Sequence, residues 1–452
     1  MSAKSINPAT GELMKEFPYI IEQELEIKII KAHETYKTWK KTSFEERKEL
    51  FYKLYDLMIS QKEELAKLDT LEMGMLYKDA LGDIEKSASN ARFFADNTEK
   101  LVAPKTIEDG VKAKIIYEPM GIVFSIMPWN YPFNQALRSV IPNIMAGNTV
   151  LMKHASNVPQ TAAKIEELFR QAGFPEGVYT NLFIPHDFTE KIIADPRIIG
   201  VNVTGSNTVG RQVGNLAGKY LKPSLLELGG SDAFILAQTN DVDKAVAQAI
   251  KGRFSNSGQK CNCSKRFFVV ESVYEEFVTK FKVAVENLKV GDPMNAETQI
   301  GPLAKEGGLI ELDNQIQDSI KAGATLLVGG KRLPQAGNFY APTLLTDVKP
   351  GMRVFDEETF GPVAPVIKVK DIKEAVQMAN NSKYGLGCSV FGDNEEDLNY
   401  VINNIETGNV SVNKIVTSYA NLPYGGIKDS GYGKELGENG IKAFTNEKVV
   451  VW

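Results

Sequence analysis

The sequence has few of the residues that build disulfide frameworks and metal centres. It contains 3 cysteines and 3 histidines among 452 residues. Two of the cysteines, Cys261 and Cys263, are one residue apart, and three cysteines so placed do not form a disulfide framework. Metal sites need further cysteine or histidine ligands at short spacing. The remaining candidates are scattered along the chain, so we expect no metal.

An excess of basic residues and long apolar runs are also lacking. The net charge of −5 gives no basic surface of the kind that binds nucleic acid. No apolar run approaches the length of a membrane span, and Met1 to Lys4 is not the start of a signal peptide. We therefore expect a cytoplasmic protein that binds neither nucleic acid nor membrane.

The chain is long enough for two or three domains. Apolar residues from Leu25 to Trp39 recur at steps of three and four, which predicts a helix. Capping-box patterns at Ser43 to Glu46 and at Ser60 to Glu63 predict that two more helices begin there. For residues 102–117 we expect a short hairpin outside the main sheet.

The pattern of apolar residues changes after Gly121, where near-continuous apolar runs alternate with helical segments. This alternation is typical of α/β proteins, in which helices cover both faces of a parallel sheet. The pattern restarts after Gly230, which indicates a second α/β domain. The predicted strands are Ile122–Met127, Thr149–Met152, Ile198–Val203, Leu225–Leu226, Ala233–Ala237 and Phe267–Val270.

The loop from Phe254 to Cys263 is the strongest candidate for chemistry. It places Cys261 after a small polar segment in which Gly258 leaves the sulfur accessible. A thiol reacts as thiolate, which needs an electropositive setting. We expect Lys260, Lys265 and Arg266 to supply that charge. The alternative is that Cys261 is a small buried apolar residue.

Polar residues follow three predicted strands, where ligands of α/β sheets bind. Asn130 is placed to hold an oxyanion, or is a turn residue beside proline. Lys153 is placed to bind ribose hydroxyls or phosphate. The alternative is that it is a solvated lysine without a ligand. Thr204-Gly205-Ser206 opens a helix whose N–H groups suit phosphate. A fourth candidate, Glu227, ends an apolar run, so burial raises its pKa toward that of a general base, unless it forms a structural ion pair.

Together these segments resemble the aldehyde dehydrogenase superfamily over essentially the whole chain. The spacing of Glu227 and Cys261 is also that of the superfamily. Several motifs in the same order are more specific than any one alone. They are Pro128-Trp129-Asn130, Lys153, Thr204-Gly205-Ser206, Glu227-Leu228-Gly229-Gly230, Gly258-Gln259-Lys260-Cys261 and Glu358-Thr359-Phe360-Gly361-Pro362.

The resemblance implies an α/β fold with a Rossmann-like cofactor domain (residues 1–100 and 120–229) and an α/β catalytic domain (230–430). A small β oligomerisation element (101–119 and 445–452) would make a homodimer or homotetramer.

The resemblance also implies a mechanism. Cys261 attacks an aldehyde, Asn130 and the Cys261 N–H hold the oxyanion, and Glu227 activates the water that hydrolyses the thioester. The residues expected around the cofactor are Trp129, Lys153, Ser156, Thr204, Gly205, Ser206, Glu358 and Phe360.

Cofactor choice depends on Ser156. Many members have Glu at this position, which accepts the ribose 2′-OH of NAD and repels a 2′-phosphate. Ser156 removes that repulsion, so we expect NADP or NAD, with NADP slightly favoured. His154, where many members have Pro, is similar to a short-chain branch that includes bacterial succinate-semialdehyde dehydrogenases.

Substrate choice depends on few residues. Arg138, eight positions after Asn130, and Ser418 match carboxylate-binding positions of succinate-semialdehyde dehydrogenases. The alternative for Arg138 is a salt bridge on a helix. Some relatives carry a second Arg where this chain has Ser255. Cys263 is similar to a second thiol that can trap the first as a disulfide, which predicts redox sensitivity.

The expected reaction is oxidation of succinate semialdehyde to succinate with NAD(P)+. Another short-chain or uncharged aldehyde is the main alternative substrate. A Cys–His hydrolase needs an imidazole base, and no histidine has a suitable position. A silent binding protein on the same fold is disfavoured because both Cys261 and Glu227 are present.

Overall fold

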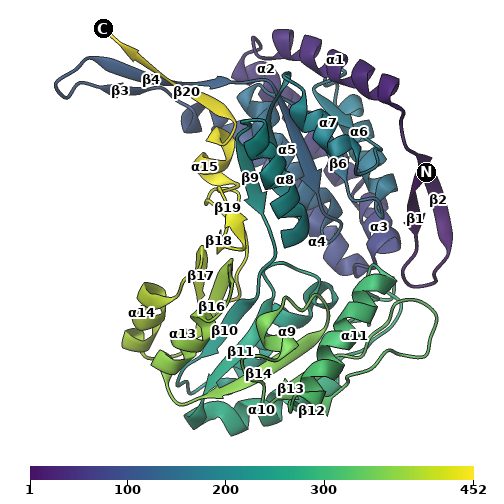
Figure 1. Cartoon of the computed structure of the whole chain (residues 1–452), viewed down its shortest axis with the longest axis vertical. Helices are drawn as coiled ribbons and strands as arrows, with labels where there is room; N and C mark the ends of the chain where they lie inside the picture. Colours follow the sequence, from purple (N-terminus) through teal and green to yellow (C-terminus); the bar gives the residue numbers. More distant parts are fainter.

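Two largely parallel sheets organise the computed structural model, which describes residues 1–452 (Figure 1). The first sheet has six strands, and only the short β19 is antiparallel to its neighbour. In spatial order its strands are β19 (Gly431–Tyr432), β9 (Ser224–Glu227), β8 (Ile198–Thr204), β5 (Ile122–Met127), β6 (Thr149–His154) and β7 (Tyr179–Asn181).

Helices cover both faces of this sheet, as the continuous apolar strands predicted. Alternate side chains of a strand point to opposite faces. Val123 and Met127 of β5 accordingly join one core, and Ile122 and Phe124 join another. The helices of this unit are α1 (Glu22–Trp39), α2 (Phe44–Ser60), α3 (Lys62–Met73), α4 (Tyr77–Leu101), α5 (Pro132–Ala146), α6 (Pro159–Gln171), α7 (Phe188–Ala194), α8 (Asn207–Lys219) and α15 (Gly437–Lys442).

The second sheet has seven strands and its own apolar core, which confirms the predicted restart after Gly230. In spatial order they are β12 (Thr325–Val328), β13 (Thr343–Thr346), β14 (Val363–Val369), β11 (Ser264–Val270), β10 (Asp232–Leu236), β16 (Gly387–Phe391) and β17 (Asn409–Val412). Its helices are α9 (Val242–Phe254), α10 (Glu271–Glu286), α11 (Glu306–Lys321), α12 (Arg353–Asp356), α13 (Ile372–Asn380) and α14 (Glu395–Asn404).

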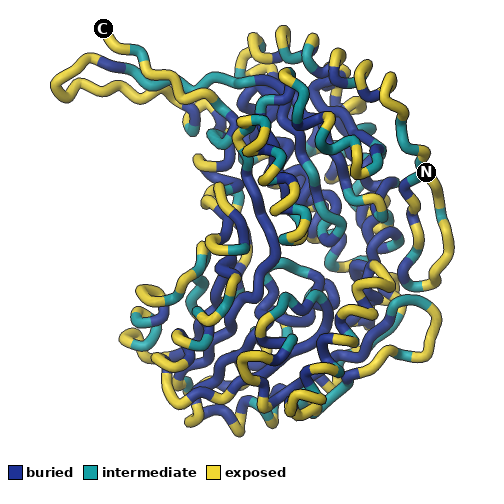
Figure 2. Tube along the Cα trace, in the orientation of Figure 1, coloured by how far each residue is buried: buried dark blue, intermediate teal, exposed yellow.

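Three small sheets complete the fold. The N-terminal hairpin pairs β1 (Ser2–Ile6) with β2 (Leu13–Pro18), and β15 (Tyr384–Gly385) pairs with β18 (Ile427–Lys428). The predicted hairpin lies in an arm that projects from the body and is mostly exposed (Figures 1 and 2). The arm consists of β3 (Lys105–Ile107), β4 (Ala113–Pro119) and the C-terminal β20 (Thr445–Val451).

Both predicted helices begin at their capping-box patterns, but Ser60 is not the cap of the second. Ser43 caps α2 as expected, and its hydroxyl accepts a hydrogen bond from the Glu46 N–H. Ser60 instead ends α2, because its hydroxyl donates to the Leu57 carbonyl one turn earlier, 3.0 Å away. A hydroxyl bonded backward into its own helix is not available to cap the next one, and α3 begins after Gln61.

No helix combines the length and the apolar character needed to cross a membrane. The structure also contains no group of three or more His, Cys, Asp or Glu side chains placed to hold a metal ion.

Two buried carboxyls, Asp69 and Asp83, lie between α3, α4 and α5. Burial and the mutual repulsion of the two groups raise the pKa of Asp69 well above its ordinary value. Burial raises the pKa of Asp83 to about 7, although the Asn134 N–H and Lys86 oppose the shift. Because two carboxylates cannot donate to each other, the pair is stable when it shares a proton.

This pair predicts a pH-dependent stability. A carboxyl whose pKa is raised on folding costs stability as the pH rises from its unfolded pKa to its folded one. Asp69→Asn supplies an N–H donor to Asp83 and removes one charge. We expect it to stabilise the protein by about 1–3 kcal/mol at pH 8 and by much less at pH 5, measured by thermal unfolding. Asp96→Asn, at an exposed site on α4, is the control. A gain that is equal at both pH values would contradict the shared proton.

Candidate active site

The carboxyl edge of the first sheet brings four predicted segments together. Asn130 follows β5, Lys153 lies near the end of β6, Thr204 ends β8, and Glu227 ends β9. The strand register aligns them, since Ile126 pairs with Lys153 and Thr204 pairs with Glu227. These strand ends therefore form one continuous edge, as the parallel sheet predicted.

The amino edge of the second sheet faces this row. Cys261 lies just before β11, and Glu358 and Phe360 lie just before β14. The Phe360 ring meets the Trp129 ring edge-to-face across the gap, with centroids 5.7 Å apart. A cavity of about 250 Å³ lies between the two edges. It is lined by Pro128, Trp129, Asn130, Gln135, Thr204, Gly205, Ser206, Leu228, Gly229, Cys261, Glu358 and Phe360.

The loop before Cys261 has a backbone conformation that few residues adopt. Asn256, Ser257 and Gly258 have φ values of 50°, 53° and 76°. Side chains compensate for this strain: Asn256 donates to the Asn130 carbonyl (2.8 Å) and Ser257 to the Gly301 carbonyl (2.9 Å). A Cβ on Gly258 would lie 2.2 Å from the Gly361 oxygen. The loop is thus locked against both sheets.

Asn130 is buried and keeps a donor free. Its Nδ2 donates one hydrogen bond to the Gln259 carbonyl at 3.0 Å. A carboxamide has two N–H groups, so the second remains available in the cavity that Asn130 shares with Cys261. This arrangement suits an oxyanion formed on a carbon bonded to the sulfur.

The environment of Cys261 differs from the expected electropositive one. Burial raises the pKa of its thiol to about 11, while Lys265 and Arg138 oppose the shift. Of the three expected cations, only Lys265 faces the nucleophile segment, because its ammonium donates to the carbonyls of Gly230 (2.7 Å) and Cys261 (2.5 Å). Arg266 donates instead to the Ser231 carbonyl, and Lys260 lies over the Tyr131 ring. Desolvation outweighs the cations, so the free thiol is protonated at neutral pH.

Glu227 is 2% exposed, and its Oε1 has no hydrogen-bond partner. Burial, followed by the nearby Glu435 carboxylate, raises its pKa well above the ordinary value, while Arg138 and Lys434 oppose the shift. The direction agrees with the prediction from sequence. A carboxylate with a raised pKa is a stronger base, and an unpartnered oxygen is free to accept a proton.

Arg138 forms the salt bridge that was the alternative to a substrate clamp. Its Nε donates to Glu435 Oε2 at 2.6 Å, and its guanidinium lies over the Tyr424 ring. No protein atom accepts a hydrogen bond from Nη1. The sequence did not point to Glu435, because it lies 297 residues away. The clamp itself stays a prediction.

Three further residues have defined positions. Ser418 is buried, and its hydroxyl accepts a hydrogen bond from Lys86 Nζ at 2.8 Å. Ser255 donates its hydroxyl to the Lys251 carbonyl within α9. Cys263 is fully buried as a free thiol, with Sγ 3.7 Å from the Arg253 carbonyl. Its redox role stays a prediction.

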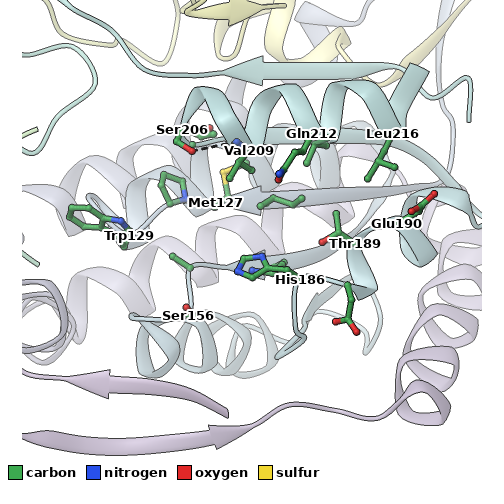
Figure 3. Close-up of a pocket in the computed structure, with 18 of the residues that line it drawn as sticks. Met127, Trp129, Ser156, His186, Thr189, Glu190, Ser206, Val209, Gln212 and Leu216 are labelled. Atoms are coloured by element: carbon green, nitrogen blue, oxygen red, sulfur yellow. Dashed lines mark hydrogen bonds between the residues drawn. The ribbon is translucent and has the colours of Figure 1, made fainter. Parts of the chain in front are cut away.

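A second cavity, of about 740 Å³, adjoins the first. Trp129, Thr204, Gly205 and Ser206 line both. In Figure 3 Trp129 lies at one end of this second cavity and Glu190 lies at the other end. Ser206 caps α8, where its hydroxyl accepts from the Val209 N–H at 3.4 Å.

The cavity fits an extended phosphorylated ligand. The Thr204 hydroxyl is buried without a partner. A Cβ on Gly205 would meet no atom within 4 Å, which leaves space beside the amino end of α8. Ser156 is exposed at the cavity wall.

Three basic side chains converge in this cavity, and the sequence pointed only to Lys153. Burial and Lys305 lower the pKa of Lys153 to about 8. Lys153, burial and Lys305 lower the pKa of His186. The acidic residues in the lining are Asp187 and Glu190, and Glu190 already pairs with Lys219 at 2.7 Å. Lys305 and His186 could not be found from sequence, because no motif contains them.

Comparison with known proteins agrees with this geometry. The aldehyde dehydrogenase family model matches residues 1–450. The chain belongs to the aldehyde dehydrogenase family. It is an oxidoreductase that acts on aldehydes, with the α/β fold that the resemblance implied. Glu358 Oε1 accepts hydrogen bonds from Lys265 Nζ (2.8 Å) and the Gly230 N–H (3.2 Å), and its role toward a cofactor stays a prediction.

Several relatives of this aldehyde dehydrogenase carry a more specific name. The succinate-semialdehyde dehydrogenase [NADP(+)] of Deinococcus radiodurans is 42% identical and covers 99% of this chain and 94% of its own. The succinate-semialdehyde dehydrogenase [NADP(+)] of Mycobacterium avium is 41% identical, and the match covers 100% of this chain and 96% of that protein. The crystal structure of succinic semialdehyde dehydrogenase from Streptococcus pyogenes with NADP+ superposes with a TM-score of 0.97 at 36% identity, covering 99% of each chain.

The pocket argues against a Cys–His hydrolase, because no histidine lines the cavity of Cys261. In this dehydrogenase both ring nitrogens of His154 form hydrogen bonds with backbone groups, so neither is free to act as a base. Its Nδ1 accepts from the Ala155 N–H at 2.9 Å, so its Nε2 donates to the Pro132 carbonyl at 2.9 Å. Burial lowers its pKa to about 4, and the ring is neutral.

The raised pKa of Cys261 is open to direct measurement. In the ligand-free enzyme we expect the rate of alkylation by iodoacetamide to rise continuously from pH 7 to pH 10, without a plateau below pH 9. Mass spectrometry of the modified peptide, with Cys261→Ser as control, would show that the rate belongs to this thiol. A plateau between pH 6 and 8 would show an activated thiolate and contradict the dominance of burial.

Proposed function

We propose that this enzyme oxidises succinate semialdehyde to succinate with NADP, through a covalent intermediate on Cys261. The observation that carries the proposal is that Cys261 shares a cavity with Asn130, which keeps one N–H free, and lies close enough to Glu227 for that carboxylate to raise the pKa of the thiol. Relatives at 41–42% identity over 99–100% of the chain carry the succinate-semialdehyde name, which supports the substrate.

The first step forms a bond from Cys261 Sγ to the aldehyde carbon. The thiol proton leaves toward Glu227, the nearby base with a free oxygen. The carbonyl electron pair moves onto oxygen, where the Asn130 N–H and the Cys261 backbone N–H stabilise it. Such a donor is worth about 10²–10³-fold in rate.

The bound cofactor supplies the hydride acceptor. When the thiohemiacetal carbon loses its hydride, the C=O bond forms again as a thioester. After Glu227 has passed the thiol proton to solvent, it takes a proton from water. The hydroxide attacks the thioester carbon, and the C–S bond breaks to release the acid and the Cys261 thiolate, which recovers a proton from Glu227. A strong buried base therefore serves both the attack and the hydrolysis.

The far carboxylate of the substrate would meet Arg138. The Glu435 pair occupies Nε and leaves Nη1 without a protein partner. The guanidinium is also fixed by Glu435 and by the Tyr424 ring. A preorganised guanidinium loses little entropy when it binds a carboxylate.

NADP is favoured by the excess of positive charge in the larger cavity. Lys153 and Lys305 have no carboxylate within 4.0 Å, and Ser156 carries no charge that would repel a 2′-phosphate. Thr204 and the amino end of α8 would hold the pyrophosphate, and Glu358 a ribose. The printed names of the relatives also carry NADP.

The hydrolytic role of Glu227 predicts a burst. With succinate semialdehyde and NADP, Glu227→Gln should form about one NADPH per active site, more slowly than wild type because the attack uses the same base, and then turn over roughly 10²-fold or more slower than wild type. Stopped-flow absorbance at the NADPH band measures both phases. Glu438→Gln, at an exposed carboxylate, is the control. Unchanged turnover would remove Glu227 from the hydrolysis step.

The cationic cavity predicts cofactor choice. Lys305→Met should weaken NADP binding by about 10- to 100-fold, the cost of a lost charged hydrogen bond, and change NAD binding by less than about threefold. Quenching of tryptophan fluorescence gives both dissociation constants without turnover. Lys321→Met, at an exposed site at the end of α11, is the control. Equal weakening of NAD and NADP would contradict a role in phosphate selection.

We also propose that the arm pairs copies of this chain. Val449 and Val451 of β20 and the following Trp452 are 61%, 60% and 67% exposed. β20 is an edge strand that pairs with β4 on one side only. A homodimer or homotetramer would cover them. The domain limits given above, the assembly and the cytoplasmic location stay predictions.

A further inference from the structure

Lys86 lies outside every motif of the sequence, yet it reaches the substrate side of the site. It belongs to α4 in the first unit, and its Nζ donates to Ser418 Oγ, 2.8 Å away and 332 residues distant in sequence. Ser418 lies in the loop after β17, on the second unit. The ammonium thus joins the two units.

This hydrogen bond fixes what the Ser418 hydroxyl can do. A hydroxyl has one proton to donate, and here an ammonium occupies a lone pair. No protein group accepts the Ser418 proton. The O–H is therefore free to donate to a ligand, and Lys86 keeps further N–H donors. A group that accepts from both is an anion with two oxygens.

The charges around Lys86 also favour an anion. Arg138 from α5 and Lys260 from the nucleophile loop face it as cations, and Asp83 faces it as an acid. Asp83 shares its proton with Asp69 and accepts from the Asn134 N–H. Neither Lys86 nor Lys260 forms a salt bridge, and Glu435 compensates only Arg138. Burial and the two cations lower the pKa of Lys86 to about 8, a cost that a bound carboxylate relieves.

We propose that Lys86 is a further specificity residue: it adds a positive charge to the carboxylate-binding position that the resemblance assigns to Ser418 and Arg138, and so forms with Ser418 a receptor for aldehydes with a terminal carboxylate. The inference rests on the proposed function and deepens it. Lys86 contributes the charge, Ser418 contributes an oriented O–H donor, and the α4–α5 contact sets the distance between Lys86 and Arg138.

The first test compares two aldehydes of the same length. Lys86→Met keeps the apolar stem and removes the charge. It should lower kcat/KM for succinate semialdehyde by about 10- to 100-fold, mainly through KM, and leave kcat/KM for butanal within about twofold. Lys86→Arg should recover most of the loss. Lys100→Met, at an exposed site on the same helix, should change neither. An equal loss for both aldehydes, or no loss for either, would overturn the receptor.

A second measurement separates this inference from the proposed function. Isothermal titration of succinate into the ligand-free enzyme detects the receptor without catalysis. Wild type should bind succinate, and Lys86→Met should bind it at least about tenfold more weakly. If wild type binds succinate but does not oxidise succinate semialdehyde, the proposed reaction fails and the receptor stands. If Lys86→Met binds succinate as tightly as wild type, the receptor fails whatever the reaction.

Discussion

A single buried ammonium ties the active site together. Lys265 is 1% exposed at its side chain, and an ammonium so buried needs partners for all three N–H groups. It finds them in the Gly230 carbonyl, the Cys261 carbonyl and the Glu358 carboxylate. These acceptors belong to the segment after β9, the nucleophile loop and the segment before β14. The position of Cys261 relative to both sheets depends on these three hydrogen bonds.

The centre of the site is desolvated and close to neutral, which has a chemical consequence. Burial raises the pKa of both Cys261 and Glu227. The thiol is then a poor nucleophile until it loses its proton, but a neighbouring base of raised pKa is suited to take it. Each group alone is disfavoured in its charged form, but transfer of a proton from the thiol to the Glu227 carboxylate only moves one negative charge from oxygen to sulfur and adds none.

The sequence could predict what local patterns determine. Strand ends are set by apolar runs, so Asn130, Lys153, Thr204 and Glu227 were predicted on one edge and lie there. Ser60 shows the limit of a local pattern, because a capping box and a backward hydrogen bond use the same hydroxyl. Contacts between the two units had no local signal. Lys86 meets Ser418 across 332 residues, and Arg138 meets Glu435 across 297. Periodicity does not determine such distances.

The distribution of charge connects the two halves of the proposed function. The whole chain carries −5, yet two groups of basic side chains flank the neutral centre: Lys153, Lys305 and His186 on one side, Lys86 and Arg138 on the other. Burial makes the charges of Lys153 and Lys86 costly without an anion. A phosphorylated cofactor would satisfy the first group and a carboxylate the second. The hydride and the aldehyde would then meet between them, because the two anions fix opposite ends of the reacting pair. Specificity for both ligands thus follows from Lys153, Lys305 and Lys86, which the folded protein leaves without a carboxylate partner, and from Arg138, which Glu435 holds in place.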